Sequence, residues 1–158
     1  MKKVPVRFVV NGVEKAEFVD SCSTLLSVLR DKIGDTSPKD GCHQGTCGAC
    51  TVIVNGETRL SCLMLAETCE GATIETVKGL SSSDALHGLQ QAFVSGFAAQ
   101  CGFCTPGMIM AAKALLDRNP NPTREEVMEA ISGNICRCTG YAPIVAAILS
   151  AAAASRRQ

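Results

Sequence analysis

The sequence predicts an α+β protein made of two small units, a strand-rich unit followed by a helical one. Two stretches of alternating apolar and polar residues each turn back at an Asn-Gly pair, at residues 11–12 and 55–56. This pattern is the strongest short-range signal for a β-hairpin. From Ser81 onward the apolar residues recur with the 3.6-residue period of a helix. We therefore assign residues 1–78 to the first unit, residues 79–83 to a linker and residues 84–158 to the second unit.

The first unit is predicted to contain two hairpins with a helix between them. Residues 4–10 and 13–19 form the first hairpin, and residues 51–54 and 57–61 form the second. Ser23 or Thr24 caps a short helix that Gly34 ends, because a short side-chain oxygen satisfies the free N–H groups of a first turn. A helical turn at residues 63–68 and a last strand at residues 72–77 complete the unit.

The second unit is predicted to contain four helices. Asp84 caps the first or interacts favourably with its dipole, and the apolar face of that helix carries Leu86, Leu89, Phe93 and Phe97. The second helix begins behind residues 105–106 and stops before residues 119–122, where two prolines follow. A capping box at residues 123–126 starts the third, and a proline at residue 143 opens the fourth, which runs to about residue 155. Three methionines of this unit are expected to fill the core: Met108, Met110 and Met128.

The composition excludes several classes of function. Among 158 residues, 15 Lys and Arg balance 15 Asp and Glu, so the formal net charge is zero and binding to a nucleic acid has no support. Hydrophobic residues make up 46% of the chain, but none of their runs reaches the roughly 18 residues of a membrane span. The first residues lead straight into a strand pattern. We therefore expect no signal peptide and a cytoplasmic location.

The first group of cysteines has the spacing of a plant-type [2Fe–2S] site. Cys42, Cys47 and Cys50 are spaced C-x4-C-x2-C, and Cys62 follows at a distance. Four thiolates must converge on two irons from one tight loop, and the fourth must arrive from elsewhere in the chain. Three glycines of the loop allow positive φ angles and let backbone N–H groups approach the sulfurs: Gly41, Gly45 and Gly48.

The second group of cysteines lies where the predicted helices begin and end. Cys101 and Cys104 separate the first two helices, and Cys136 and Cys138 separate the last two. Two loops at one end of a helical unit can bring four thiolates together, so we predict a second [2Fe–2S] site here. Such clusters would also cross-link two units that are small enough to need the support. Cys22 and Cys69 stand outside both groups and are expected to be small buried apolar residues.

Other readings of the cysteines fit the pattern less well. A disulfide framework or a group of buried apolar cysteines would not require this spacing together with the glycines. A Rieske centre needs two histidine ligands, and the chain has only His43, which fits better in a solvated loop, and His87. A zinc-binding module would accept both C-x2-C pairs but fits the C-x-C pair poorly. No cysteine outside the two groups has a base near it in the sequence, so a catalytic cysteine is the weakest alternative.

Three motifs, in this order, resemble the signatures of one family, the small iron–sulfur subunits of molybdenum hydroxylases. The family includes xanthine dehydrogenases, aldehyde oxidoreductases, carbon monoxide dehydrogenases and nicotinate dehydrogenases. The resemblance covers residues 4–150, and the ligand pattern shows no departure. The three motifs are Gly41-Cys42-His43-Gln44-Gly45-Thr46-Cys47-Gly48-Ala49-Cys50-Thr51-Val52, Gln100-Cys101-Gly102-Phe103-Cys104-Thr105-Pro106-Gly107-Met108 and Gly133-Asn134-Ile135-Cys136-Arg137-Cys138-Thr139-Gly140-Tyr141.

The resemblance implies a β-grasp, plant-type ferredoxin domain followed by a four-helix-bundle [2Fe–2S] domain. It also implies a large partner subunit that binds molybdenum through a pyranopterin, and usually an FAD subunit. By this likeness the helical cluster lies next to the pterin, which Gln100 and Cys138 touch, and the other cluster lies on the flavin side. Without the resemblance, Gln100 would be read as a polar residue at a helix C-terminus.

The resemblance further implies that the chain carries electrons between the two partner cofactors and that no residue of its own transforms the substrate. That substrate would be a purine, another N-heterocycle or an aldehyde. A free-standing two-cluster ferredoxin is the alternative. The balanced charge argues mildly against it, because such carriers often use an acidic surface to reach their partners.

Overall fold

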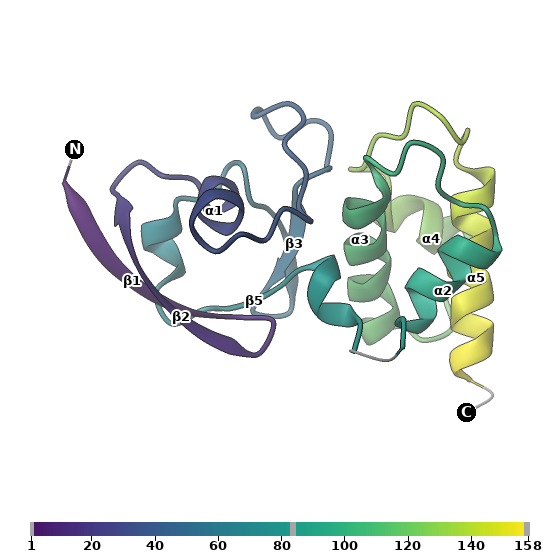
Figure 1. The fold of residues 1–158 in the computed structure, drawn as a ribbon. Coiled ribbons are helices and arrows are strands. Elements are labelled where there is room, and N and C mark those ends of the chain that lie inside the picture. Colours follow the sequence, from purple (N-terminus) through teal and green to yellow (C-terminus); the bar gives the residue numbers. More distant parts are fainter. Residues whose placement is uncertain (1, 83–84, 157–158) are drawn as a thin grey trace.

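The computed structural model describes residues 2–82 and 85–156, and these form a sheet half and a helical half that lie side by side (Figure 1). The sheet has five strands in the order β2-β1-β5-β3-β4. Only the pairing of β1 with β5 is parallel. The strands are β1 (Lys3–Val10), β2 (Val13–Asp20), β3 (Thr51–Val54), β4 (Glu57–Leu60) and β5 (Thr73–Glu75).

Both predicted hairpins are confirmed, and their turns have the expected geometry. Asn11 and Gly12 have φ angles of 51° and 79°, and Asn55 and Gly56 have 50° and 82°. Positive φ at both central residues is the mark of a type I′ turn, whose twist matches that of the flanking strands. The hairpin of β3 and β4 matters for function, because it returns the chain beside the first cysteine loop.

A short helical segment covers one face of the sheet. Thr24 caps it, since its side-chain oxygen accepts a hydrogen bond from the Ser27 N–H at 3.1 Å. The predicted helix is therefore present, but after α1 (Leu25–Ser27) it continues as a π-helical segment, η1 (Val28–Lys32), before Gly34 with φ 77°. The predicted turn at residues 63–68 lies slightly later, as the 3₁₀ segment η2 (Ala66–Cys69).

The helical half contains the four helices that the sequence predicts. They follow a 3₁₀ segment, η3 (Val77–Leu80), which joins the halves. The capping box is present as predicted, because the Thr123 hydroxyl accepts from the Glu126 N–H at 3.2 Å and the Glu126 carboxylate accepts from the Thr123 N–H at 2.7 Å. The four helices are α2 (Gly88–Ser95), α3 (Thr105–Arg118), α4 (Arg124–Ala130) and α5 (Ala142–Ser155).

The first helix of this half is shorter than the sequence predicts. It begins at Gly88, and the His87 ring caps it by accepting the Leu89 N–H at 3.2 Å. Asp84, the expected cap, lies outside the described residues. Leu86 precedes the helix and is 51% exposed, while Phe97 follows it with φ 50° and is 84% exposed. Only the two middle residues of the predicted apolar face therefore enter the core.

Two further expectations about single residues are wrong. Met108 and Met110 are fully buried as predicted, but Met128 is 52% exposed because it lies on the outer face of α4, next to the buried Val127. Cys69 is buried, whereas Cys22 is exposed in the turn that follows β2. Neither error touches the two cysteine groups.

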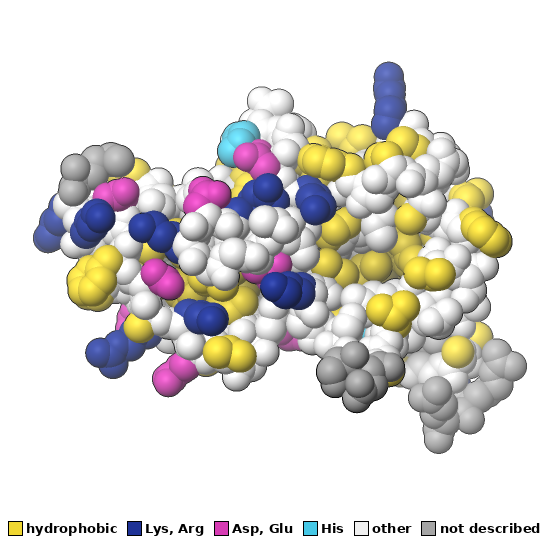
Figure 2. Space-filling view, in the orientation of Figure 1, with side chains coloured by type: hydrophobic (Ala, Val, Ile, Leu, Met, Phe, Trp, Pro, Cys, Tyr) yellow, Lys and Arg dark blue, Asp and Glu magenta, His cyan; other side chains and the backbone are white. Residues whose placement is uncertain are grey.

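The two halves are packed together rather than tethered. Ile53 of β3 is buried against Met110 and Ala114 of α3, with residues of η3 beside them. Hydrophobic side chains gather over the helical half and near the junction, while charged side chains are scattered mostly over the sheet half (Figure 2). Among the described residues no helix is long and apolar enough to cross a bilayer.

A buried carboxylate, Asp35, links the segment after η1 to the residue that follows β5 and to Asn11 in the turn of the first hairpin. Asp35 is 3% exposed and accepts hydrogen bonds from the Thr76 hydroxyl at 2.7 Å and from the Ser37 N–H at 3.0 Å. Burial alone would raise the pKa of Asp35, but these donors and the charge of Lys78 outweigh it and hold the pKa below its usual 3.8. Asp35 is therefore ionised and satisfied inside the sheet half.

We expect Asp35→Asn to lower the free energy of unfolding by about 1–3 kcal/mol, because hydrogen bonds to a charged acceptor are lost. The depressed pKa also predicts a pH effect. The contribution of the wild-type carboxylate is complete above the unfolded-state pKa near 3.8 and disappears as the pH falls through the lower folded-state value. Denaturant titrations at pH 7 and below pH 4 should therefore show the two proteins converging in acid. A gap that stays constant with pH would contradict the assignment.

Candidate metal centres

The first cysteine group is assembled by one irregular loop and one hairpin. Residues 41–50 run without helix or strand between η1 and β3, and Cys62 is the second residue after β4. The hairpin returns Cys62 to the loop, because the Ser61 hydroxyl donates to the Cys50 carbonyl at 2.7 Å. As a result the Cys50 and Cys62 thiols contact each other, and the Cys42 thiol contacts that of Cys47.

Hydrogen-bond donors of the loop point at these sulfurs. The Thr46 hydroxyl and the backbone N–H groups of Gln44 and Cys47 donate to Cys42, and together they lower its pKa to about 5. Burial raises the pKa of Cys62 to about 11, with the neighbouring Cys50 adding to the rise, although the Gly45 N–H also donates to that sulfur. A loop that directs N–H groups at its own cysteines is suited to sulfurs that carry negative charge.

The three loop glycines serve different needs. Gly45 and Gly48 have φ angles of 78° and 69°, as predicted. Gly41 does not lie in the positive φ region, so that part of the expectation is wrong. A Cβ atom at Gly41 would instead lie 2.9 Å from the Cys47 sulfur and 3.4 Å from the Phe103 ring. Gly41 is therefore needed for space rather than for its backbone conformation.

The second cysteine group is assembled by the loops at one end of the helical half. Cys101 and Cys104 lie between α2 and α3, and Cys136 and Cys138 lie between α4 and α5. The sulfurs of Cys101 and Cys138 are 3.6 Å apart, and the Cys104 thiol contacts that of Cys136. The structure therefore brings together the four residues that the sequence grouped.

The pKa values of the two buried sulfurs of this group shift in opposite directions. Burial raises the pKa of Cys104 to about 12, and the nearby Cys136 adds to the rise. Burial also acts to raise the pKa of Cys136, but the Thr139 hydroxyl and the backbone N–H groups of Thr139 and Cys138 outweigh it and lower that pKa to about 7. The loop after α4 therefore directs more hydrogen-bond donors at Cys136 than burial can offset.

The sulfurs are arranged in the same way in both groups. Each group contains one buried pair of sulfurs and one accessible pair. Cys50 and Cys62 are buried while Cys42 and Cys47 are partly exposed, and Cys104 and Cys136 are buried while Cys101 and Cys138 are exposed. In each group, therefore, one side of the site faces the protein interior and the other faces the surface. The eight residues concerned are those of the two predicted ligand sets.

This arrangement fits a binuclear iron–sulfur group. Two irons that share four thiolates need two on each iron, and the sulfurs lie in two such pairs. In the parts of the chain that the structure describes, no three Cys, His, Asp or Glu side chains gather around one point as they would for a single ion. The buried Thr105 hydroxyl, directly after Cys104, has no hydrogen-bond partner among the described residues, and a polar group held by this loop would give it one.

The two cysteine loops also touch each other. The buried Asn134 side chain donates to the Gly48 carbonyl at 2.9 Å and contacts the Thr51 hydroxyl at 3.3 Å. The next residue, Ile135, donates its N–H to the Cys47 carbonyl at 2.9 Å. No role is predicted for Asn134 from the sequence, although its position two residues before Cys136 indicates that it belongs to the site.

The remaining predicted site residues lie at the surface. Gln100 is exposed beside Cys101, five residues beyond the end of α2. This position argues against its reading as a helix C-terminal residue. His43 is exposed and pairs with Asp40 at 2.5 Å. It is a solvated loop residue, as predicted.

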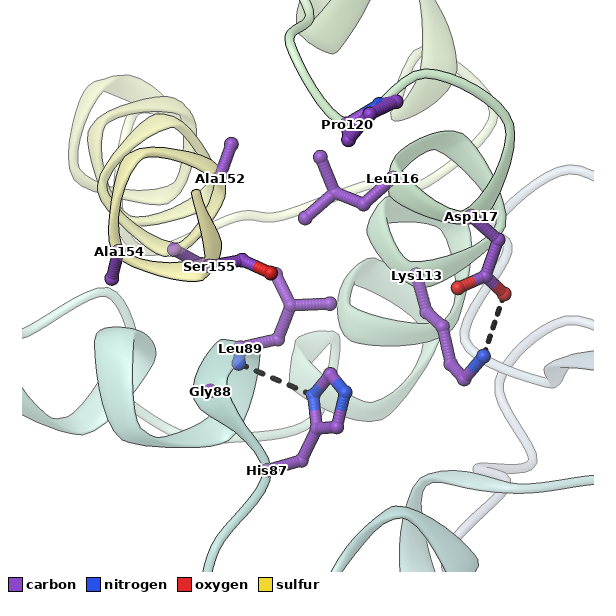
Figure 3. A pocket seen from close by; sticks show the side chains of 11 residues that line it. His87, Gly88, Leu89, Lys113, Leu116, Asp117, Pro120, Ala152, Ala154 and Ser155 are labelled. Atoms are coloured by element: carbon purple, nitrogen blue, oxygen red, sulfur yellow. Dashed lines mark hydrogen bonds and ion pairs between the residues drawn. The ribbon is translucent and has the colours of Figure 1, made fainter. Parts of the chain in front are cut away.

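A cavity of about 330 Å³ lies at the opposite end of the helical half from the cysteines, between α3, the start of α2 and the end of α5 (Figure 3). Three of its polar side chains are already engaged, since Lys113 pairs with Asp117 at 2.6 Å and His87 caps α2. Burial and the charge of Lys113 lower the pKa of His87, which keeps that ring neutral. This cavity has no cysteine in its lining and takes no part in the two sites.

Comparison with known proteins agrees with this geometry. Residues 8–89 match a family described as a 2Fe-2S iron-sulfur cluster binding domain, and residues 76–149 match a [2Fe-2S] binding domain. The chain is 48% identical to the nicotinate dehydrogenase small FeS subunit of Eubacterium barkeri, covering 94% of each chain. It is 49% identical to the nicotine 6-hydroxylase small subunit of Paenarthrobacter nicotinovorans, covering 94% of this chain and 90% of the relative.

A solved structure extends the likeness to the fold. The crystal structure of quinoline 2-oxidoreductase from Pseudomonas putida 86 contains a chain that matches with a TM-score of 0.95 and 44% identity, over 99% of this chain and 98% of that one. The chain belongs to the small iron–sulfur subunits of the molybdenum hydroxylase family.

The chain is therefore the iron–sulfur subunit of an oxidoreductase, and its role is electron transfer. The comparisons support this role over that of a free-standing ferredoxin. The cofactors of the chain are [2Fe–2S] clusters. The α+β fold with one five-stranded sheet agrees with the class that the sequence predicts.

The contact between the cysteine loops makes Gly107 of α3 a test of the site. A Cβ atom there would lie 2.3 Å from the Gly48 carbonyl oxygen and 2.8 Å from the Asn134 amide. Alanine normally stabilises a helix by about 1 kcal/mol relative to glycine. We nevertheless expect Gly107→Ala to lower the free energy of unfolding by about 1–3 kcal/mol, because a backbone atom must move.

Gly88→Ala is the matched control, since Gly88 also lies in a helix but a Cβ there meets nothing within 4 Å. We expect this variant to be neutral or more stable by up to about 1 kcal/mol. Denaturant titration of both variants makes the comparison. If Gly107→Ala were as stable as Gly88→Ala, the close contact between the loops would not constrain the fold.

Proposed function

We propose that the chain holds one [2Fe–2S] cluster at each cysteine group and conducts electrons between a molybdopterin site and a flavin. The sulfur geometry carries the proposal, because each group offers two pairs of thiols, one buried and one accessible. The ligands of the first cluster are Cys42, Cys47, Cys50 and Cys62, and those of the second are Cys101, Cys104, Cys136 and Cys138. The two halves then correspond to a β-grasp, plant-type ferredoxin domain and a four-helix-bundle [2Fe–2S] domain, at residues 1–78 and 84–158, with a linker at residues 79–83.

When bound, each [2Fe–2S] group accepts and releases one electron at a time, so that two of them in series suit transfer between two-electron sites. The protein supplies eight thiolates and the N–H and O–H donors that stabilise their charge. The buried pairs shield one side of each group from water, which lowers the local dielectric and strengthens those hydrogen bonds. The accessible pairs leave the other side open to a partner.

The helical end of the chain is the proposed docking face for the large subunit. Gln100 and Cys138 are exposed at this end and would contact the pterin. Large apolar side chains of the same loops are also exposed, and such residues mark a surface that a partner covers. They are Phe97 at 84%, Phe103 at 46%, Ile135 at 52% and Tyr141 at 36% exposure.

The sheet end is the proposed side of the flavin, with an FAD subunit as the second partner. The accessible Cys42 and Cys47 lie in a loop that also exposes His43 and Asp40. This polar surface differs from the apolar one around Cys101 and suits a separate interface. We also place the protein in the cytoplasm, because all ten cysteines are unpaired and a reducing compartment keeps them so.

The names of the relatives indicate a range of substrates for the whole enzyme. Proteins acting on nicotinate, nicotine and aldehydes are among them. We propose a substrate of the same kind, a purine, another N-heterocycle or an aldehyde, which is hydroxylated on the large subunit.

Metal analysis of the complex purified from its native host tests the proposal. We expect about four irons and four acid-labile sulfides per chain, together with stoichiometric molybdenum and bound FAD in co-purifying subunits. Zinc in place of iron would overturn the ligand assignment. Full iron without molybdenum or partner subunits would overturn the place of the chain between the two cofactors.

Replacement of single cysteines tests the ligand sets. We expect Cys104→Ala to lose the iron of the helical site, about half of the total, and to melt at a lower temperature because that site cross-links two loops. Cys69→Ala is the matched control, since Cys69 is equally buried but lies in neither group. It should keep all the iron and lose only about 1 kcal/mol of stability. Unchanged iron in Cys104→Ala would show that Cys104 is not a ligand.

A further inference from the structure

We propose that the Thr139 hydroxyl raises the reduction potential of the helical centre by donating a hydrogen bond to the Cys136 sulfur. The inference rests on the function proposed above and assigns a positioning role to a residue that is not itself a ligand. The Thr139 oxygen lies 3.1 Å from Cys136 Sγ, within the range of an O–H···S hydrogen bond. Thr139 follows the C-x-C pair directly, so that a single tight loop carries both ligands and the donor.

Tyr141 decides the direction of this hydrogen bond. Its backbone N–H donates to the Thr139 oxygen at 3.2 Å, so one acceptor position of the hydroxyl is occupied. The single proton of the hydroxyl is then free to point at the sulfur, and a metal-bound thiolate can only accept it. The threonine is therefore oriented as a donor by the loop itself.

Tyr141 is in turn fixed by the same loop. Its φ angle is 67°, in the left-handed region that a tyrosine rarely occupies. Its phenol oxygen accepts the Cys136 N–H at 2.9 Å. The phenol and the backbone N–H of one residue thus hold the Cys136 backbone and the Thr139 side chain at once, which keeps the hydroxyl beside the sulfur.

The surroundings make this hydrogen bond effective. Cys136 is 8% exposed, so little water competes for its sulfur, and hydrogen bonds in such a setting are electrostatically stronger. One-electron reduction would make the bound centre more negative by one charge, and no bond of the protein would be made or broken. A donor to a thiolate stabilises the more negative state and so raises the potential.

Thr139→Val tests the proposal, because valine has the same shape but no hydroxyl. The variant and the wild type are purified as the full chain with their partner subunits, and their two centres are titrated with EPR detection. The signal that Cys104→Ser abolishes identifies the helical centre. We expect the potential of this centre to fall in Thr139→Val, while the other centre keeps its wild-type value and serves as an internal control.

Thr139→Ser separates the hydroxyl from the general packing of the loop. Serine keeps the O–H, and we expect its potential to lie closer to the wild-type value than to that of Thr139→Val. Iron and sulfide content is measured in every sample. Full content with an unchanged potential in Thr139→Val would overturn the inference, as would equal shifts at both centres or equal shifts in the serine and valine variants. A wild-type complex without iron would instead overturn the proposed function itself.

Discussion

The structure depends on one close contact between backbone segments. At this contact Gly48 packs against α3 and against the loop before Cys136. A Cβ atom at Gly48 would lie 2.3 Å from the Gly133 carbonyl oxygen, and one at Gly107 would lie 2.3 Å from that of Gly48. Asn134 closes the contact with a hydrogen bond to the same Gly48 carbonyl. Because only residues without a side chain fit at positions 48 and 107, the backbones of the two cysteine loops and of α3 approach each other closely, and the Asn134 side chain links them.

The two sulfur groups solve the same electrostatic problem with different folds. A cluster of thiolates brings negative charge into a partly buried site, where desolvation alone would disfavour it. In the first site, backbone N–H groups of a glycine-containing loop donate hydrogen bonds to Cys42 and Cys62 and so stabilise negative charge on these sulfurs. The other uses the short loop after α4, where a hydroxyl and backbone N–H groups converge on Cys136. In both, one pair of sulfurs is buried and the other is accessible from the surface.

The two halves of the chain present different surfaces. Large apolar side chains are exposed in the loops around Cys101 and Cys138, whereas charged side chains are scattered mostly over the sheet half (Figure 2). The cavity beside His87 contains the Lys113–Asp117 ion pair and has no cysteine in its lining (Figure 3). The chain therefore contributes by positioning two sites, each at a set distance from a different surface.

The sequence by itself determined the elements and the membership of each cysteine group, because hairpin turns, helix caps and ligand spacing are local patterns. Three such patterns are the Asn11-Gly12 turn, the capping box of Thr123 and Glu126, and the C-x4-C-x2-C loop. Each of them spans only a few residues of the sequence. Only the tertiary structure decided which sulfurs are buried, which donors reach them and how the loops meet. Asn134 and Gly48 are 86 residues apart, and Phe97 leaves the helix face that its spacing predicts because the chain turns at Gly96. Such outcomes depend on how distant segments pack, and no local pattern in the sequence contains that information.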